Sequence, residues 1–270
     1  MVVVSLPNGQ GSQAQRTGPT ASGGYTVLGV SVFVSPGGPS YELDDVLRRA
    51  GAVFSGRVGR PVAVNYGSAC GELAVCVSGV GLVDRSGLST LEIEAPAAQL
   101  GLLIERFLDG VLAPGGALSV GATWWCRAAP NRILAISEPA VGQRLGERVR
   151  VQAMHQVPVV VRDRSAELAA LELLGRDAHQ VLRRLGVFGE SGDPRGVHPF
   201  SPGTVEGIDV LWLLESDRRA LALVAHERAG DLWRALEQAG HEFGISCVGR
   251  DAATRYALLE RFRRARLLGD

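Results

Sequence analysis

The sequence contains no lysine, and all 28 of its basic residues other than histidine are arginines. Without a lysine amine the chain can use neither a Schiff-base lysine nor a Walker-type lysine against a phosphate. The 28 arginines are balanced by 28 acidic residues. Because the net charge is zero, no overall field draws the protein toward nucleic acid or a membrane surface, and we expect neither as a partner.

Cysteine and long apolar runs are also scarce. The four cysteines show no CxxC spacing and have no adjacent histidine, which argues against a metal site. They suit reduced thiols in a cytoplasmic protein. No run of about 18 apolar residues is present that could span a bilayer. Residues 1–4 are apolar but too few to form a signal peptide.

What is present is enough apolar sequence for a large core, since 46% of the 270 residues are hydrophobic. Residues 1–24 are rich in Gly, Ser, Gln and Thr without a hydrophobic period, and we predict a disordered tail there. Residues 25–270 are predicted to form one domain. Within it, residues 41–50 have the charge pattern of a short helix, and residues 252–268 predict a terminal helix with a basic outer face.

A strand-then-helix phrase occurs twice in this domain. Residues 91–99 and 171–179 match each other, and residues 133–149 match residues 221–239 in the same order. The offset grows between the two matches because residues 189–196 are an insert of turn-forming residues. The sequence therefore predicts a duplication, with a first copy at about residues 88–150 and a second at about 165–245. A pocket between the copies is the default site for a small-molecule substrate.

Each copy is predicted to follow the order strand, helix, two strands, helix, with a hairpin in place of the first of these two strands in the second copy. In the first copy these are residues 89–94, 97–108, 117–127, 132–137 and 140–149. In the second they are residues 168–174, 177–184, a hairpin of residues 204–205 and 208–215, then 221–225 and 228–239. Antiparallel strands beside crossover helices predict an α+β fold, in which duplicated βαββα units form mixed or antiparallel sheets with helices.

Four segments resemble a known family in the correct order. Residues 223–247 are similar to a strand, helix and leucine-tryptophan stretch of the glycine cleavage T-protein (aminomethyltransferase) family. Residues 81–86 (Gly-Leu-Val-Asp-Arg-Ser) resemble its glycine-leucine-phenylalanine-aspartate-leucine-serine phrase. Residues 65–75 and 169–178 resemble two further phrases. The family includes folate domains of dimethylglycine and sarcosine dehydrogenases and the gamma subunit of heterotetrameric sarcosine oxidase.

The resemblance implies a folate-binding domain with a tetrahydrofolate pocket at the centre of the duplicated fold. Asp109 falls near the family's catalytic carboxylate, with a spacing difference of one residue. Asp217 falls where the family has a glutamate that anchors the pterin, and Arg250 matches an arginine that contacts the folate tail. Tyr66 lies in one of the matching segments and is a further candidate for cofactor contact.

Trp124 is a candidate for cofactor contact on grounds that do not depend on the family resemblance. Trp124 and Trp125 lie in the middle of a predicted strand, where successive side chains point to opposite faces. One of the two is therefore expected to point inward, where it can stack on a pterin or another planar ligand. The alternative interpretation is an ordinary core tryptophan.

The chain also departs from the family pattern. Residues 213–216 (Leu-Leu-Glu-Ser) replace a loop with a tyrosine and two glycines, and Ala257 stands in place of an arginine. We expect no counterpart of the family's C-terminal barrel, because the sequence ends at Asp270. These departures concern the folate-binding loop more than the fold.

Three functions therefore remain open. The first is a tetrahydrofolate-dependent one-carbon transferase, in which a carboxylate supports transfer of a methyl or aminomethyl group. The second is a non-catalytic subunit like the sarcosine oxidase gamma chain, working with an oxidase-type partner or as a homo-oligomer. The third is a pocket that no longer binds folate and shapes an apolar substrate for cyclisation or rearrangement in secondary metabolism.

Overall fold

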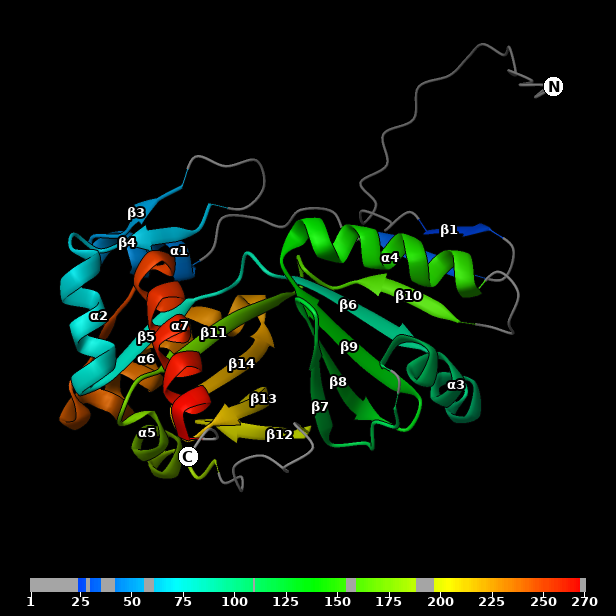
Figure 1. Ribbon diagram of the computed structural model, residues 1–270. Coiled ribbons are helices and arrows are strands. Elements are labelled where there is room, and N and C mark those ends of the chain that lie inside the picture. The colour runs from blue at the N-terminus through cyan, green and yellow to red at the C-terminus, as the bar shows by residue number, and fades with distance from the viewer. Residues whose placement is uncertain are drawn as a thin grey trace, which may run out of the picture.

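The computed structural model describes residues 24–27, 30–34, 42–55, 61–108, 110–153, 159–187 and 197–267 (Figure 1). The predicted tail at residues 1–24 lies outside these ranges except for Gly24. The elements that precede the first copy are β1 Gly24–Val27, β2 Val30–Val34, α1 Glu42–Arg49, β3 Val53–Phe54, β4 Ala63–Asn65, α2 Ala69–Ser78 and β5 Val80–Asp84.

Both copies have the order strand, helix, three strands, helix. The first copy contains β6 Ser89–Glu94, α3 Ala97–Leu108, β7 Gly116–Val120, β8 Thr123–Ala129, β9 Arg132–Ser137 and α4 Pro139–Ala153. The strand β10 Val160–Asp163 follows it. The second copy contains β11 Leu168–Leu174, α5 Ala178–Arg184, β12 Val197–Val205, β13 Ile208–Ser216, β14 Arg219–Ala225 and α6 Ala229–Gly240. The chain then forms β15 Ile245–Cys247 and α7 Arg250–Leu267.

The predicted α+β class is confirmed, with one correction to the repeated unit. Residues 117–127 were predicted as a single strand, but they form the β7–β8 hairpin, which turns at Gly121 with a positive φ of 62°. Glycine adopts this backbone conformation without the steric cost that other residues meet. The unit is therefore βαβββα. The predicted insert at residues 189–196 lies outside the described ranges.

One mixed sheet of 13 strands runs through the molecule in the order β1-β2-β10-β6-β9-β8-β7-β12-β13-β14-β11-β5-β15. Only the pairs β2–β10 and β5–β15 are parallel among those described in it. The sheet divides where β7 pairs with β12, and the two halves turn their inner faces toward each other. Side chains of both halves share one apolar cluster, which includes Cys126, Leu134, Phe200 and Leu223.

Helices cover the outer face of each half. In the first half, α3 buries Leu100, Leu103 and Ile104 at helical spacing against β6, β8 and β9, in a cluster to which α4 also contributes. In the second half, α1, α5 and α6 cover the outer face, with Trp233 fully buried. The helices α2 and α7 pack together beside β5 at the far end of the sheet (Figure 1).

The two copies exchange their neighbouring strands. The strand β5, which precedes the first copy, pairs with β11 of the second copy. The strand β10, which precedes the second copy, pairs with β6 of the first copy. Each copy is therefore completed by a strand that lies next to the other copy in the sequence.

The turns after these two strands are built alike. Asp84 Oδ1 accepts a hydrogen bond from the Ser86 amide at 2.9 Å, and Asp163 Oδ1 accepts one from the Ser165 amide at 2.9 Å. In both turns the intervening arginine donates its amide to a carbonyl of the neighbouring strand at 2.8 Å. The Asp-Arg-Ser sequence at residues 84–86 thus recurs at residues 163–165 with the same local structure. Both arginines face a buried glutamate.

Candidate functional site

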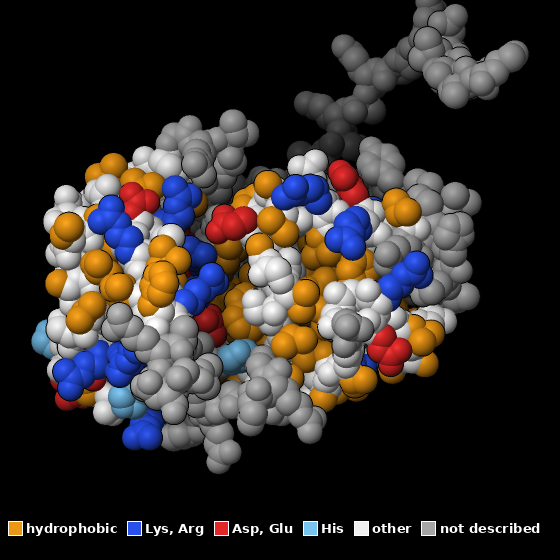
Figure 2. All heavy atoms as spheres, viewed as in Figure 1, with side chains coloured by type: hydrophobic (Ala, Val, Ile, Leu, Met, Phe, Trp, Pro, Cys, Tyr) orange, Lys and Arg blue, Asp and Glu red, His pale blue; other side chains and the backbone are white. Residues whose placement is uncertain are grey.

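A cavity of about 390 Å³ lies between the inner faces of the two halves. Figure 2 shows the hollow between the halves, with charged and histidine side chains beside it. Its volume falls within the range of about 300–1,000 Å³ typical of small-molecule sites. Six charged side chains, each from a different part of the fold, line it: Arg85, Glu138, Glu172, Glu215, Arg219 and Arg261.

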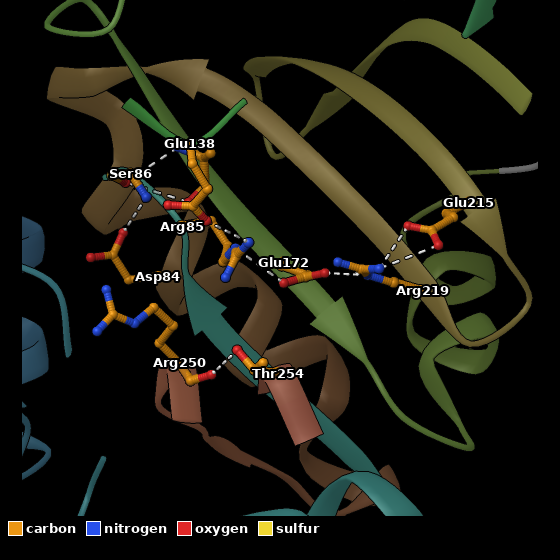
Figure 3. A network of polar contacts seen from close by, with 10 residues as sticks. Asp84, Arg85, Ser86, Glu138, Glu172, Glu215, Arg219, Arg250 and Thr254 are labelled. Atoms are coloured by element: carbon orange, nitrogen blue, oxygen red, sulfur yellow. Dashed lines mark hydrogen bonds and ion pairs between the residues drawn. The ribbon is translucent and has the colours of Figure 1, made fainter. Parts of the chain in front are cut away.

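Five of these charged side chains form a continuous network across one wall of the cavity (Figure 3). Glu172, in the middle of β11, forms an ion pair with Arg85 at 3.4 Å through one carboxylate oxygen, and its other oxygen accepts a hydrogen bond from the Arg219 guanidinium. Arg219 also contacts Glu215 at 3.0 Å, and Arg85 contacts Glu138 at 3.7 Å. Two arginines are therefore shared among three carboxylates.

The network holds Glu172 in its ionised form. Burial alone would raise the pKa of this carboxyl, whose side chain is only 3% exposed. The charges of Arg219 and Arg85, together with the hydrogen bond from Arg219, outweigh burial and lower the pKa below its usual value. In Arg219, burial would lower the pKa, but Glu172 and Glu215 raise it. Glu172 and Arg219 on this wall of the cavity are therefore both charged.

The backbone determines where these charges lie. Leu171 and Leu173 point from β11 into the helix-covered cluster of the second half, so Glu172 between them points to the inner face. Arg219 begins β14, which pairs with β11. Arg85 lies in the turn after β5 and donates its amide to the Ala170 carbonyl at 2.8 Å. The adjacent strands β14, β11 and β5 thus bring Arg219, Glu172 and Arg85 together.

Aromatic and apolar side chains form the rest of the cavity. The rings of Trp124 and His198 meet edge to face with centroids 5.2 Å apart. The apolar lining residues are Leu88, Ile136, Leu213 and Leu221. This combination of a flat aromatic ring, an apolar surface and a polar wall suits a planar ligand with hydrogen-bonding edges.

The helix α7 closes one edge of the cavity. Arg261 lines both the main cavity and a small adjoining recess, which also includes Glu215, Arg219 and Tyr256. Burial, followed by the charge of Glu260, raises the pKa of Tyr256 to about 12. Tyr256 is therefore neutral near neutral pH and able to donate a hydrogen bond.

The structure places one of the five predicted site residues in this cavity. Trp124 lines it, whereas its neighbour Trp125 packs into the cluster beneath the helices, as the alternation of strand side chains requires. Asp109 lies outside the described residues. Asp217 occupies the turn between β13 and β14 with a side chain that is 65% exposed. Its neighbour Glu215 reaches the cavity instead.

Tyr66 and Arg250 are the two remaining predicted site residues. Arg250 is the first residue of α7, and its carbonyl accepts a hydrogen bond from the Thr254 hydroxyl at 2.8 Å (Figure 3). Tyr66 packs beside the core of the second half, where burial raises the pKa of its phenol above the usual value, with Cys247 the next cause. Neither residue is among those described as lining the cavity, and their roles stay predictions.

The sequence interpretation missed the charged network. A usable signal was the glutamate that both repeated phrases share in the middle of a buried strand, Glu92 in the first and Glu172 in the second. A charged residue there requires a partner. The structure supplies arginines in both copies, since Glu92 contacts Arg164 at 2.8 Å and Arg132 at 3.7 Å. Only Glu172 is described as lining the cavity.

Two further observations concern the described residues alone. They contain no group of three or more His, Cys, Asp or Glu side chains placed to hold a metal ion. No helix among them is both long and apolar enough to cross a membrane.

Comparison with known proteins shows similarity in structure and not in sequence. No protein-family model and no curated protein matches the chain. The glycine cleavage system aminomethyltransferase T from Bartonella henselae superposes with a TM-score of 0.60 at 17% identity, over 78% of this chain. The chain spans 59% of the length of that protein.

A second solved structure is similar over a shorter part of this chain. One chain of the heterotetrameric sarcosine oxidase from Corynebacterium sp. U-96 superposes with a TM-score of 0.50 at 24% identity. The match covers 66% of this chain and 93% of that one. At these identities the similarity establishes the fold: this protein has the α+β architecture of the glycine cleavage T-protein and of a sarcosine oxidase chain.

Proposed function

We propose that the cavity between the two halves binds the pterin of a reduced folate, and that the protein supports transfer of a one-carbon unit from an amine. The observation that carries this proposal is the set of three carboxylates on one wall, one of which is kept ionised by two arginines. The fold of an aminomethyltransferase is consistent with it.

The residues present fit a pterin. Its aminopyrimidine edge presents N–H donors, for which the oxygens of Glu215 and Glu138 are suitable acceptors. Its ring is flat and matches the Trp124 face as a stacking surface. When bound, the folate supplies the nitrogen that accepts the one-carbon unit. The cavity volume accommodates a ring system of this size.

The chain's own contribution is orientation and charge. The three carboxylates and three arginines that line the cavity balance in charge, so a positively charged amine carbon would be stabilised by the oxygens of individual carboxylates and not by a net negative potential. Because the arginines hold these carboxylates in place before any ligand arrives, little reorganisation is required. Asp109 remains the proposed catalytic carboxylate from the family resemblance.

Thermal unfolding with tetrahydrofolate tests the proposal. A ligand present at about 100 times its dissociation constant stabilises the native state by about 2.7 kcal/mol. We therefore expect a rise in melting temperature, together with quenching of Trp124 fluorescence that is lost in Trp124→Phe. Unchanged melting at millimolar tetrahydrofolate would refute folate binding.

A second candidate is a non-catalytic subunit. It is supported by the match that covers 93% of one chain of a heterotetrameric oxidase. In this case the purified protein binds an oxidase-type partner and shows no transfer of its own. Complex formation without any response to folate would favour this function.

A third candidate is a repurposed pocket that acts on an apolar substrate. Its supporting observation is the apolar surface formed by Leu88, Ile136, Leu213 and Leu221. Under this function, apolar ligands raise the melting temperature and folates do not. The same thermal screen therefore separates all three candidates.

A further inference from the structure

The helix α2 lies on the surface of the protein but has no charged residue on its exposed side. Its only charged residue is Glu72, which is buried and accepts the amides of Tyr66 at 2.7 Å and Gly249 at 2.8 Å. The exposed side of the helix instead consists of Cys70, Gly71, Ala74, Val77 and Ser78. A helix that faces water normally carries charged side chains on that side.

The helix α7 adds a second apolar surface directly beside it. The two helices share a core in which Cys76 packs with Ala252 and Tyr256. On its outer side α7 exposes three large apolar side chains: Leu258 at 49%, Leu259 at 48% and Phe262 at 69%. Figure 2 shows hydrophobic side chains and arginines gathered over α2 and α7 on the same face of the molecule.

Arginines border this apolar surface. Arg255 and Arg263 are exposed on α7, and Arg176 is exposed beside the end of α2, where its amide bonds to the Cys76 carbonyl. Of the acidic residues nearby, Glu260 is already in contact with Arg218 at 3.4 Å and Arg263 at 3.8 Å. Asp251 is exposed, but it lies in the first turn of α7 and offsets the positive charge of the arginines only there. The border is therefore predominantly positive.

We propose that the α2–α7 face, defined by Val77, Leu258, Leu259 and Phe262 with their arginine border, is the docking surface for a different protein. The partner has an apolar patch that covers these side chains and acidic residues that meet the arginines. An exposed apolar patch with a polar rim is the usual composition of a protein interface. The inference does not depend on which ligand the cavity holds.

The arrangement of charge argues against the two other occupants of such a face. In a twofold dimer the same surface is present on both sides, and the arginine borders would meet each other. A helix that binds a lipid surface inserts an apolar stripe and keeps its arginines on the opposite, polar face. However, Arg255 lies on the same helical stripe as Leu258, Leu259 and Phe262, at i+3, i+4 and i+7. Insertion of this stripe would therefore bury the stem of Arg255, and its guanidinium would have to extend back to the head groups.

Site-specific photocross-linking of the full chain tests the proposal. The substitution Phe262→benzoylphenylalanine is introduced in cells of the source organism, with Leu102→benzoylphenylalanine as the control. Leu102 is comparably exposed, at 58%, but lies on α3 in the other half. We expect position 262 alone to cross-link to one other polypeptide, at a peptide that is rich in acidic residues.

The cross-linked protein is then purified and titrated against matched variants. Leu258→Asp and Phe262→Asp should weaken binding at least tenfold, whereas Leu102→Asp should leave it unchanged. Binding should also weaken with added salt, because the border contacts are between exposed charges. All three positions are exposed, and unchanged melting temperatures confirm that the variants fold.

Four results would overturn the proposal. The first is a cross-link between two copies of this chain, with a dimeric mass in solution, and the second is a cross-link to lipid, with binding to phosphatidylglycerol vesicles. The third is equal cross-linking at positions 262 and 102. The fourth is a cross-linked protein whose affinity is unaffected by Leu258→Asp and Phe262→Asp.

Discussion

Replacing Glu172 by glutamine removes the charge at the centre of the cavity wall while keeping its size. Removing one member of a buried ion pair typically costs about 3–5 kcal/mol. Here Arg219 retains Glu215 and Arg85 retains Glu138, and both arginines are partly exposed. We therefore expect Glu172→Gln to lower the free energy of unfolding by about 3 kcal/mol, the lower end of this range. Such a loss lowers the melting temperature by about 6–12 °C.

The effect should also depend on pH. The folded protein lowers the pKa of Glu172, so its ionised form stabilises the fold above the unfolded pKa of about 4.3. That stabilisation is lost as the pH falls through the folded value. Between pH 5 and pH 3, the wild type should therefore lose more stability than Glu172→Gln. Urea unfolding at a series of pH values measures this difference.

The first copy provides a matched control. Glu92 is also buried among arginines, but it is not described as lining the cavity. Glu92→Gln should lower stability to a similar extent and leave ligand binding unchanged. Glu172→Gln should weaken tetrahydrofolate binding on the order of tenfold, about 1.4 kcal/mol, because Arg85 and Arg219, which contact Glu138 and Glu215, lose the carboxylate that they share. If Glu172→Gln melts at the wild-type temperature, or both variants bind ligand equally well, the reasoning fails.

Three further predictions concern other parts of the fold. Gly142→Ala should destabilise the protein by about 1–3 kcal/mol in urea unfolding, since its Cβ would lie 2.2 Å from Ser89 Oγ; an unchanged midpoint would contradict this. Glu206→Asn should raise the free energy of unfolding by about 1 kcal/mol, because Glu206 has a φ of 50° in the β12–β13 turn and asparagine adopts this conformation at a lower cost. Reduced stability would argue against this prediction. In native protein near pH 8, iodoacetamide should modify exposed Cys70 fastest, because Cys126 is buried and burial raises the pKa of Cys76 and Cys247 to about 12; mass spectrometry identifies the modified thiols.

Most of the fold could be predicted from local patterns. The strand Ser89–Glu94 and the helix Ala97–Leu108 have the predicted bounds, because their apolar spacing and flanking turns are unambiguous. The β7–β8 hairpin was missed, since Gly121-Ala122 interrupts the strand pattern only briefly. Pairing between distant strands, as in β5–β11, leaves no local pattern at all.

The site was harder to predict than the fold. Family resemblance pointed to single acids such as Asp217, whereas the cavity uses Glu215 two residues away, because β13 ends at Ser216 and Asp217 lies in the exposed turn that follows it. Trp124 was found because the alternation rule limited it to two orientations. Arg85, Glu172 and Arg219 meet only through tertiary structure, although the glutamate common to both repeats was visible in the sequence.

The exchange of β5 and β10 between the copies has a consequence for how the chain folds. During synthesis, β6 must wait for β10, which follows it by a whole copy, and β5 remains unpaired until β11 emerges. Neither copy can therefore complete its sheet alone, and pairing between such distant strands is slow. We expect a fragment ending after the first copy to expose open sheet edges and aggregate.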